Sequence, residues 1–574
     1  MTILLQGTKF KKRLMPLLFP MLLAGCTSVF GDNFANTLKN DANASSDFYM
    51  NKLEQTKSVE DQQTYKLLAA RVLITENKVP QAEALLAELK DLTPEQLLDK
   101  SIIDAYILAV KRKNTEAMSA LRGINLAQLS QSQKARYYEV AAKIAENQND
   151  VIEAVKARVQ VDANLTDVQR KQENIDRTWA LLRAANKGTV SGASAESNPG
   201  LGGWLALAKT YNDNLNQPSQ LTKALESWKA QYPNHSAAYL FPTELKSVNN
   251  FQQTQLNRIS VLLPLSGNAG VIGSTVRSGF NDARGTDQSM QVEFIDTIVT
   301  PIQEAVAQAK ATGSSAIVGP LLKPNVDEVI NNSNAIQGID VLTLNSTYNE
   351  RAVDKLCYFG LSPEDEAESG AERMWNDNVR NPLVLVPQAD VGQRTASAFN
   401  VRWQQLSGND ANIRFFSSTD EAAVLIQDGA NKNAEGIYVV ATADELIDIK
   451  SALTNSGSTA RVYASSRSNT SNSTPEYRLQ MNGVRFSDIP FFKETDSTQY
   501  QKISQTTGGD YSLMRLYAMG ADAWLLINQF NELRQVPGFA VSGLTGKLSA
   551  GPNCNIERNM TWFEYQDGNV VPLN

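Results

Sequence analysis

The residue pattern of this 574-residue chain changes near residue 250, and the change limits the folds open to it. Residues 32–246 read as one helix after another, with no run that alternates apolar and polar side chains as a half-buried strand would. After residue 257, short apolar runs alternate with helical segments, which is typical of parallel βαβ units. We therefore expect an all-α domain at 26–246, a polar linker at 247–257 and an α/β domain at 258–574.

A weak internal repeat runs through the helical half. Tyr65, Ala69, Asn77 and Ala82 recur 72 positions later, and further matches lie about midway between the two sets. The unit is thus about 36 residues long, the size of a two-helix tetratricopeptide hairpin. We expect a tetratricopeptide-like solenoid, with an irregular helical bundle as the alternative. The run Thr93-Pro94-Glu95-Gln96 predicts one helix start, with an N-cap, a proline in the first turn and a capping-box partner.

The second half contains eight apolar runs that predict strands, at 259–265, 292–295, 316–318, 341–344, 383–386, 413–416, 437–440 and 462–463. Helical patterns lie between most of them, at 275–284, 303–311, 362–378, 394–406 and 444–453. The acidic run Ser362-Pro363-Glu364-Asp365 is typical of a helix start whose carboxylates are solvated and favoured by the helix dipole.

The first 25 residues have the features of an export signal that ends at Cys26. Four basic residues precede a short apolar stretch, and Leu23-Ala24-Gly25-Cys26 closes it. This run resembles the signal of bacterial lipoproteins, in which the cysteine is lipidated and becomes the N-terminus. A plain secretory signal with an incidental cysteine is the alternative, whereas a spanning helix needs about 20 apolar residues, more than this stretch offers. Several acyl chains at one residue would anchor the protein stably, since each buried methylene contributes roughly 0.8 kcal/mol.

Charge argues against nucleic acid and anionic lipid surfaces as partners. The whole chain has a formal net charge of −7; the leader holds four basic and no acidic residues, so its removal brings the charge to −11. Such a balance repels polyanions. Apart from the leader, no apolar run approaches the length of a membrane span.

Without Cys26, two cysteines remain, Cys357 and Cys554. In an oxidising compartment they are a candidate disulfide, and two buried free thiols are the alternative.

Enzyme signatures are missing from the sequence. Its single histidine, His235, is the only one available to a Ser/His/Asp triad, and no glycine-flanked nucleophile serine or phosphate-binding loop occurs. One histidine and two spare cysteines do not make a usual zinc site. We therefore expect no catalytic residues, no metal and no cofactor.

The second half resembles type I periplasmic binding proteins, a bilobed α/β family. The matching motifs, in chain order, are Leu263-Pro264-Leu265-Ser266-Gly267, Gly279-Phe280-Asn281-Asp282-Ala283, Ala316-Ile317-Val318-Gly319-Pro320 and Val341-Leu342-Thr343-Leu344-Asn345-Ser346-Thr347. Ligands in this fold lie at the carboxyl ends of strands. The resemblance implies a ligand site at Ser266, Asn345, Ser346 and Thr347, although the hydroxyl residues expected after the third strand are replaced by Leu321, Leu322 and Lys323.

Together, the lipoprotein signal, the tetratricopeptide-like half and the binding-protein half resemble one family, the penicillin-binding protein activator lipoproteins of Gram-negative bacteria. The resemblance implies an outer-membrane lipoprotein that binds a class A penicillin-binding protein (penicillin-binding protein 1A) and stimulates peptidoglycan synthesis without catalysing it. Thr27, where inner-membrane lipoproteins carry aspartate, implies the outer-membrane address. Two other functions stay open: a receptor for an amino acid or a peptidoglycan fragment, and an enzyme of wall turnover.

Overall fold

The computed structural model describes residues 34–185, 187–194, 198–286, 289–429 and 431–573, grouped into two compact units. The units are Met1–Val168 and Gln169–Asn574. The leader, Cys26 and Thr27 lie outside the described residues. The expected linker at 247–257 falls inside the second unit, so the domain boundaries inferred from composition stay predictions. Within the described ranges, no helix is both long and apolar enough to cross a bilayer.

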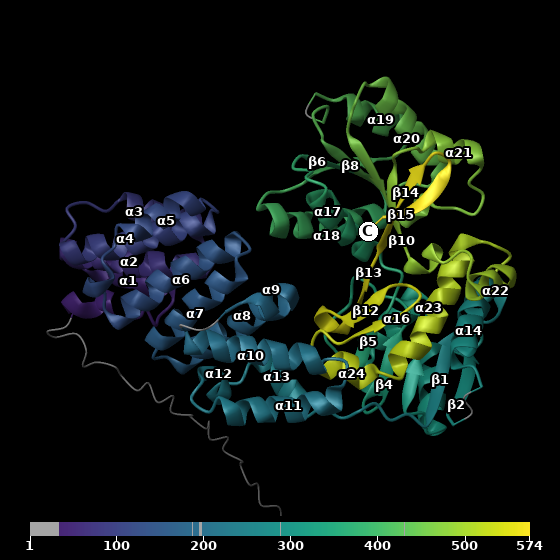
Figure 1. Cartoon of the computed structure of the whole chain (residues 1–574), viewed down its shortest axis with the longest axis horizontal. Helices are drawn as coiled ribbons and strands as arrows, with labels where there is room; N and C mark the ends of the chain where they lie inside the picture. Colours follow the sequence, from purple (N-terminus) through teal and green to yellow (C-terminus); the bar gives the residue numbers. More distant parts are fainter. Residues whose placement is uncertain (1–33, 186, 195–197, 287–288, 430, 574) are drawn as a thin grey trace, which may run out of the picture. The chain divides into compact units, whose positions relative to one another are not determined.

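The first unit consists of helices that pack in pairs (Figure 1). A short 3-10 helix, Phe34–Lys39, precedes seven α-helices: α1 (Ser46–Gln55), α2 (Val59–Thr75), α3 (Val79–Ala87), α4 (Pro94–Val110), α5 (Asn114–Arg122), α6 (Gln131–Asn147) and α7 (Val151–Asn164). The pairs α2–α3, α4–α5 and α6–α7 follow one another at nearly constant spacing, as the repeat predicts. Ala82, Ala117 and Ala154, which recur in the second helix of each pair, are fully buried.

The same local signals mark the start of each helix pair and the turn inside it. Ser58, Thr93 and Ser130 cap the first helices, and Thr93 with Gln96 forms the predicted capping box. The turn inside each pair contains one residue with positive φ, at Asn77, Arg112 and Asn149. Arginine is uncommon in that conformation, so only the two asparagines reveal the turn in the sequence.

A buried charge cluster holds the first unit together. Asp99 is fully buried, and it accepts hydrogen bonds from Arg71 at 2.8 Å and from Arg136 at 3.0 Å. Both arginines also donate to the carbonyl oxygen of Leu38, at 2.7 and 2.9 Å. Burial lowers the pKa of Arg136 to about 10, and the neighbouring Arg71 adds to that effect. Since removal of one partner leaves a buried charge unpaired, each member is expected to be sensitive to substitution.

The second unit begins with six helices: α8 (Val168–Ala184), whose first residue lies at the boundary, α9 (Lys187–Gly192), α10 (Pro199–Asn214), α11 (Pro218–Gln231), α12 (Ser236–Tyr239) and α13 (Thr243–Asn249). The polar segment after α13 is tied to a helix far along the chain. Thr254 donates to the carboxylate of Glu532 at 2.6 Å and accepts from the backbone N–H of Asn531 at 2.8 Å. The backbone N–H of Gln252 donates to Gln535. A segment held at these points is no free hinge.

Two separate sheets define two lobes of the α/β part. The first lobe contains five parallel strands in the order β2-β1-β3-β4-β5. They are β1 (Arg258–Leu263), β2 (Gln291–Asp296), β3 (Ala316–Val318), β4 (Asp340–Thr343) and β5 (Leu356–Tyr358). Helices α14 (Gly270–Arg284), α15 (Ile302–Ala311) and α16 (Lys323–Asn331) connect them. The apolar residues of these runs are almost all buried, which is why continuous apolar runs in the sequence located the first four strands.

The second lobe contains seven strands in the order β15-β14-β10-β9-β8-β6-β7. Five are parallel: β6 (Pro382–Pro387), β7 (Asn412–Phe416), β8 (Gly436–Val439), β9 (Arg461–Ala464) and β10 (Arg485–Asp488). The last two, β14 (Thr561–Gln566) and β15 (Asn569–Leu573), form an antiparallel hairpin at the edge. Its helices are α17 (Pro363–Asn376), α18 (Asp390–Ser407), α19 (Thr419–Gln427), α20 (Ala443–Asn455) and α21 (Pro475–Gln480).

The chain then returns toward the first lobe. Helices α22 (Thr498–Thr506), α23 (Tyr511–Ile527) and α24 (Phe530–Gln535) lead into a small antiparallel sheet of β11 (Ala540–Ser542), β12 (Lys547–Ala550) and β13 (Ile556–Asn559). Just before β13, Cys554 forms a disulfide with Cys357 of β5, with Cα atoms 4.7 Å apart. The returning segment is thus covalently joined to the edge of the first sheet.

Helix α23 packs against α14, and the two lie side by side in Figure 1. Two glycines allow this contact. A Cβ atom at Gly279 would lie 1.9 Å from the carbonyl oxygen of Tyr517, and one at Gly520 would lie 2.0 Å from the carbonyl oxygen of Val276. Each glycine therefore faces the backbone of the other helix. A side chain at either position would force the two helices apart.

We predict that Gly279→Ala destabilises the protein by about 1–2 kcal/mol, because an overpacking cost of up to about 3 kcal/mol outweighs the gain in helix propensity of about 1 kcal/mol. Urea denaturation measures the change. Gly192→Ala is the matched control: it is also helical, but a Cβ there meets no atom within 4 Å. Equal stability of the Gly279→Ala and Gly192→Ala proteins would contradict the proposed backbone contact.

Candidate functional site: the cavity between the lobes

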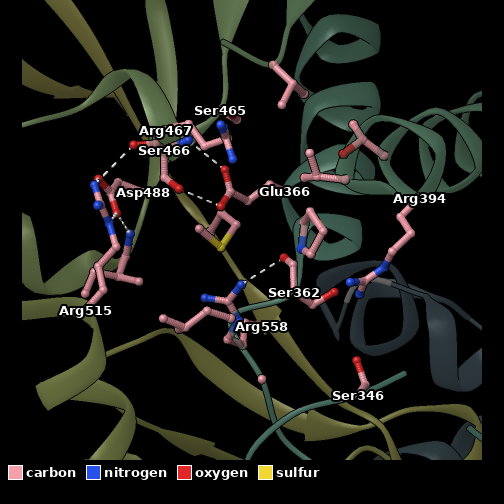
Figure 2. A pocket seen from close by; sticks show the side chains of 18 of the residues that line it. Ser346, Ser362, Glu366, Arg394, Ser465, Ser466, Arg467, Asp488, Arg515 and Arg558 are labelled. Atoms are coloured by element: carbon pink, nitrogen blue, oxygen red, sulfur yellow. Dashed lines mark hydrogen bonds and ion pairs between the residues drawn. The ribbon is translucent and has the colours of Figure 1, made fainter. Parts of the chain in front are cut away.

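A cavity of about 380 Å³ lies between the two lobes of the α/β part. The first lobe contributes the start of α16, with Lys323, and the loop after β4, with Asn345 and Ser346. The second lobe contributes the start of α17, one side of α18 and the loop after β9. Figure 2 shows the polar side chains that face one another across this space. The volume lies at the lower end of the range for small-molecule sites.

Two of the four residues named as a ligand site from the sequence line this cavity. They are Asn345 and Ser346, which follow β4 at its carboxyl end. The side-chain N–H of Asn345 donates to the carbonyl oxygen of Leu321 at 3.0 Å, so the amide itself braces the loop after β3.

The other two residues, Ser266 and Thr347, are not among the cavity lining. Thr347 donates to Asp327 on α16. Ser266 contacts Asp296 at the end of β2; burial raises the pKa of that carboxyl, but hydrogen bonds from Ser266 and nearby backbone N–H groups prevail and lower it. The structure therefore does not bring the four residues together.

The acidic start of α17 is not the solvated run that the sequence suggests. Ser362 caps the helix as expected, but the three carboxylates that follow all have protein partners. Glu364 accepts two hydrogen bonds from Arg394, at 2.5 and 2.6 Å. Glu366 accepts from the N–H and the hydroxyl of Ser466, both at 2.7 Å. Burial raises the pKa of Glu366. The expectation fails because another loop of the fold covers this helix start.

Arg558 ties the start of α17 to the small sheet. It lies on β13 with its side chain only 2% exposed, and its Nε donates to Asp365 at 2.9 Å. Its Nη2 donates to the carbonyl oxygen of Ser362 at 3.1 Å. The N-cap residue and Asp365, three residues after it, are thus held by a side chain that comes from near the C-terminus.

A second buried ion pair joins α23 to the second lobe. Arg515 of α23 donates to both carboxylate oxygens of Asp488 on β10, at 2.9 and 2.6 Å, and Asp488 is fully buried. Arg515 also donates to the carbonyl oxygens of Ser466 and Asn469 in the loop after β9. Because the carboxylate has no access to water, loss of either partner would leave a buried charge, at a cost of about 3–5 kcal/mol.

The cavity is lined mostly by polar and charged side chains. Ser362 caps α17 and Ser466 contacts Glu366, and His235 lies elsewhere, where it caps α12 and contacts Trp204 and Trp228 edge-on. Among the described residues, no three His, Cys, Asp or Glu side chains converge as metal ligands would. The lining combines hydroxyl groups with five Lys or Arg and three Asp or Glu residues, a surface suited to a polar, anionic molecule.

Most of the charged lining was not found from the sequence, but one signal was available. Ser465, Ser466 and Arg467 directly follow β9, one residue beyond the predicted strand 462–463, much as Asn345 and Ser346 follow theirs. The rule that ligands lie at strand ends applies equally to both loops. Arg515 and Arg558 offer no such signal, because each meets its partner only through the return of the chain.

Comparisons with known proteins agree with this architecture. The sequence profile of the LppC putative lipoprotein family matches residues 39–568. The penicillin-binding protein activator LpoA of Mannheimia succiniciproducens is 66% identical, with 100% of each chain covered. A crystal structure of full-length LpoA from Haemophilus influenzae is 58% identical, covers 94% of this chain and 100% of its own, and superimposes with a TM-score of 0.82. The solved C-domain of Haemophilus influenzae LpoA, described as a regulator of PBP1A, is 56% identical, covers 55% of this chain and 100% of its own, and has a TM-score of 0.54. The predicted fold class is thereby confirmed.

A half-buried carboxyl beside the cavity predicts how stability depends on pH. Burial raises the pKa of Glu350 to about 7; Asn553 and Arg394 oppose the rise, and Glu364 adds to it. Since this folded-state pKa exceeds the usual value of 4.5, the unfolded chain releases the proton first as pH rises. The contribution of Glu350 to stability is therefore complete below the usual value and is lost as pH rises to about 7.

We predict that Glu350→Gln matches the unmodified protein at about pH 5 and is more stable at about pH 8. The difference, after allowance for solvent screening, is about 1 kcal/mol. Urea denaturation at both pH values tests it, with the exposed Glu304→Gln as control. A gain of the same size at both pH values would show that charge at Glu350 is not the cause.

Proposed function

The chain belongs to the LppC lipoprotein family, and on this premise we propose that it binds and activates a class A penicillin-binding protein, penicillin-binding protein 1A. It would thereby regulate peptidoglycan synthesis. One observation carries the proposal: the 66% identity to a penicillin-binding protein activator extends along the whole of both chains. Similarity of that extent includes the helical part and both lobes.

We further propose that the chain acts by contact and not by catalysis. An activator of this kind binds the active conformation of its synthase more tightly than the inactive one, and so shifts the population. The single histidine supports a non-catalytic role, because its Nε2 lies 2.9 Å from the carbonyl oxygen of Gly200 and its Nδ1 accepts from the N–H of Ala237. Both ring nitrogens are therefore hydrogen-bonded to the backbone of the helical part.

The contact with the synthase is proposed to lie in residues 258–574. The C-domain of Haemophilus influenzae LpoA is itself described as a regulator of PBP1A, and it aligns with 55% of this chain. That share corresponds to the two lobes and the small sheet, which supports the same assignment here.

A lipid on Cys26 is proposed to anchor the chain to the outer membrane. Membership in a lipoprotein family supports the anchor, and Thr27 after the cysteine supports the outer-membrane address. A chain fixed there can meet a synthase only by reaching through the wall.

The activator function is tested with soluble residues 27–574 and purified penicillin-binding protein 1A from the same source. We predict that the chain increases the number of peptide crosslinks formed from lipid-linked precursor, in proportion to the fraction of synthase bound. Synthase with an equal amount of heat-denatured chain is the control. Unchanged crosslinking at saturating chain would contradict activation.

The same preparation separates activation from catalysis. The chain alone, incubated with isolated peptidoglycan, is expected to release no fragments. Fragment release by the chain without synthase would instead establish an enzyme of wall turnover.

The anchor is tested with Cys26→Ser and Thr27→Asp in cells. We predict that Cys26→Ser abolishes palmitate labelling, since the thiol that carries the lipid is gone. Thr27→Asp should keep the label but move the protein from the outer-membrane to the inner-membrane fraction of a density gradient. An unlabelled native protein, or one already in the inner-membrane fraction, would contradict the proposed address.

A further inference from the structure

Two of the segments that pass between the lobes run side by side. Residues 359–362 lead from β5 to α17, and Met560 leads from β13 to β14. A parallel β-bridge joins Tyr358, just before the first crossing, to Asn555, just before β13. The position of one lobe relative to the other therefore depends on how firmly these two crossings are joined.

The two crossings are joined differently at their two ends. At the first-lobe end the link is covalent, the disulfide between Cys357 and Cys554. At the second-lobe end, Arg558 of β13 donates to Asp365 and to the carbonyl oxygen of Ser362 at the start of α17. Figure 2 shows Arg558 bound to Ser362. Of the two links, only the covalent one is removed by a change in redox conditions.

The turn that carries Cys554 has a strained backbone. A hydrogen bond from the N–H of Gly551 to the carbonyl oxygen of Asn555, at 2.8 Å, closes this turn, residues 551–555. Within it, Asn553 and Cys554 have φ values of 55° and 59°. Asparagine tolerates positive φ, but cysteine adopts it only where the surrounding structure enforces it. Strain of this kind is typical of switch regions.

We propose that the disulfide between Cys357 and Cys554 is a redox-sensitive restraint on the two lobes. While it is intact, it holds the 551–555 turn in its strained conformation and keeps β13 beside the edge of the first sheet. When it is reduced, the turn relaxes and the β-bridge to β5 is lost. The second lobe, still bound to Arg558, then moves relative to the first.

The lobes do not separate, because α23 still joins them. This helix packs on α14 of the first lobe and is bound to β10 of the second through Arg515 and Asp488. The expected motion is therefore a reorientation of one lobe against the other.

Reduction requires a dithiol. Cys554 is partly exposed and Cys357 only 1% exposed, so the thiolate of the reductant attacks the sulfur of Cys554. The bond between the two cysteines breaks, and Cys357 leaves as a thiolate that takes up a proton. The second thiol of the reductant then attacks the mixed disulfide and releases Cys554. In sum, two electrons and two protons pass to the protein, and the dithiol becomes a disulfide.

The experiment measures a distance between the lobes in residues 27–574, whose only cysteines are Cys357 and Cys554. Ketone-bearing amino acids replace Glu304 on α15 and Val424 on α19, two exposed positions, one in each lobe, and carry spin labels that leave the thiols free. We expect pulsed electron resonance to give one narrow distance distribution for the oxidised protein. After treatment with dithiothreitol the distribution should be about twofold broader, with a shifted mean.

Unchanged distances in protein whose two thiols are shown to be free by mass spectrometry would overturn the proposal. No synthase is present, so the result is independent of the proposed activation.

Circular dichroism of the same samples distinguishes movement of the lobes from unfolding. Helix content should be the same before and after reduction, because each lobe has its own apolar core. Loss of helix on reduction would show that the disulfide maintains the fold itself, and would overturn the proposal. Cys357→Ser/Cys554→Ser is the control for the reductant and should resemble the reduced protein with or without dithiothreitol. A response of this variant to dithiothreitol would also overturn the proposal.

A matched pair of variants tests the strained turn. Cys357→Ser/Cys554→Gly lacks the disulfide just as Cys357→Ser/Cys554→Ser does, but glycine adopts positive φ without steric cost. With glycine the turn should keep its conformation, and the distance distribution should stay closer to that of the oxidised protein. Equal broadening in both variants would show that relaxation of the turn does not move the lobes, and would overturn the proposal.

Discussion

The contact between α14 and α23 is the constraint on which the α/β part depends. Helix α23 belongs to the segment that returns to the first lobe, and Gly279 and Gly520 let its backbone meet that of α14. The same helix carries Arg515, which is bound to Asp488 of the second sheet. One helix thus fixes both lobes at once. The width of the cavity follows from where α23 lies, and any shift of that helix would change the lining on both sides.

Buried ion pairs hold the elements that surround the cavity. Buried ion pairs add little net stability compared with apolar packing, but each is costly to break. The pairs Arg515–Asp488 and Arg558–Asp365 therefore restrict how the elements that carry them can move.

The sequence predicted what depends on local pattern. The eight apolar runs all became strands, and Thr93 became a helix cap, because burial of a strand and capping of a helix are decided by adjacent residues. Asn345 and Ser346 were found because they follow a strand. The solvation of the α17 start was predicted wrongly, because it depends on a loop distant in the chain. The hairpin β14–β15 was missed although Asp567-Gly568 between its strands is a local turn signal. Arg515 and Arg558 are paired by topology alone, which no single-sequence pattern records.

The first lobe is built from two stretches separated by most of the second lobe. The sheet of this lobe ends at Tyr358, whereas α23 begins only at Tyr511. The disulfide of Cys357 cannot form until Cys554 is present. During export, which proceeds from the N-terminus, the early strands therefore cross the inner membrane long before the helix that covers them. The apolar face of α14 must stay unaggregated until translocation is nearly complete. A premature stop codon just before Tyr511 would therefore leave the first lobe incomplete, in addition to removing the C-terminal segment.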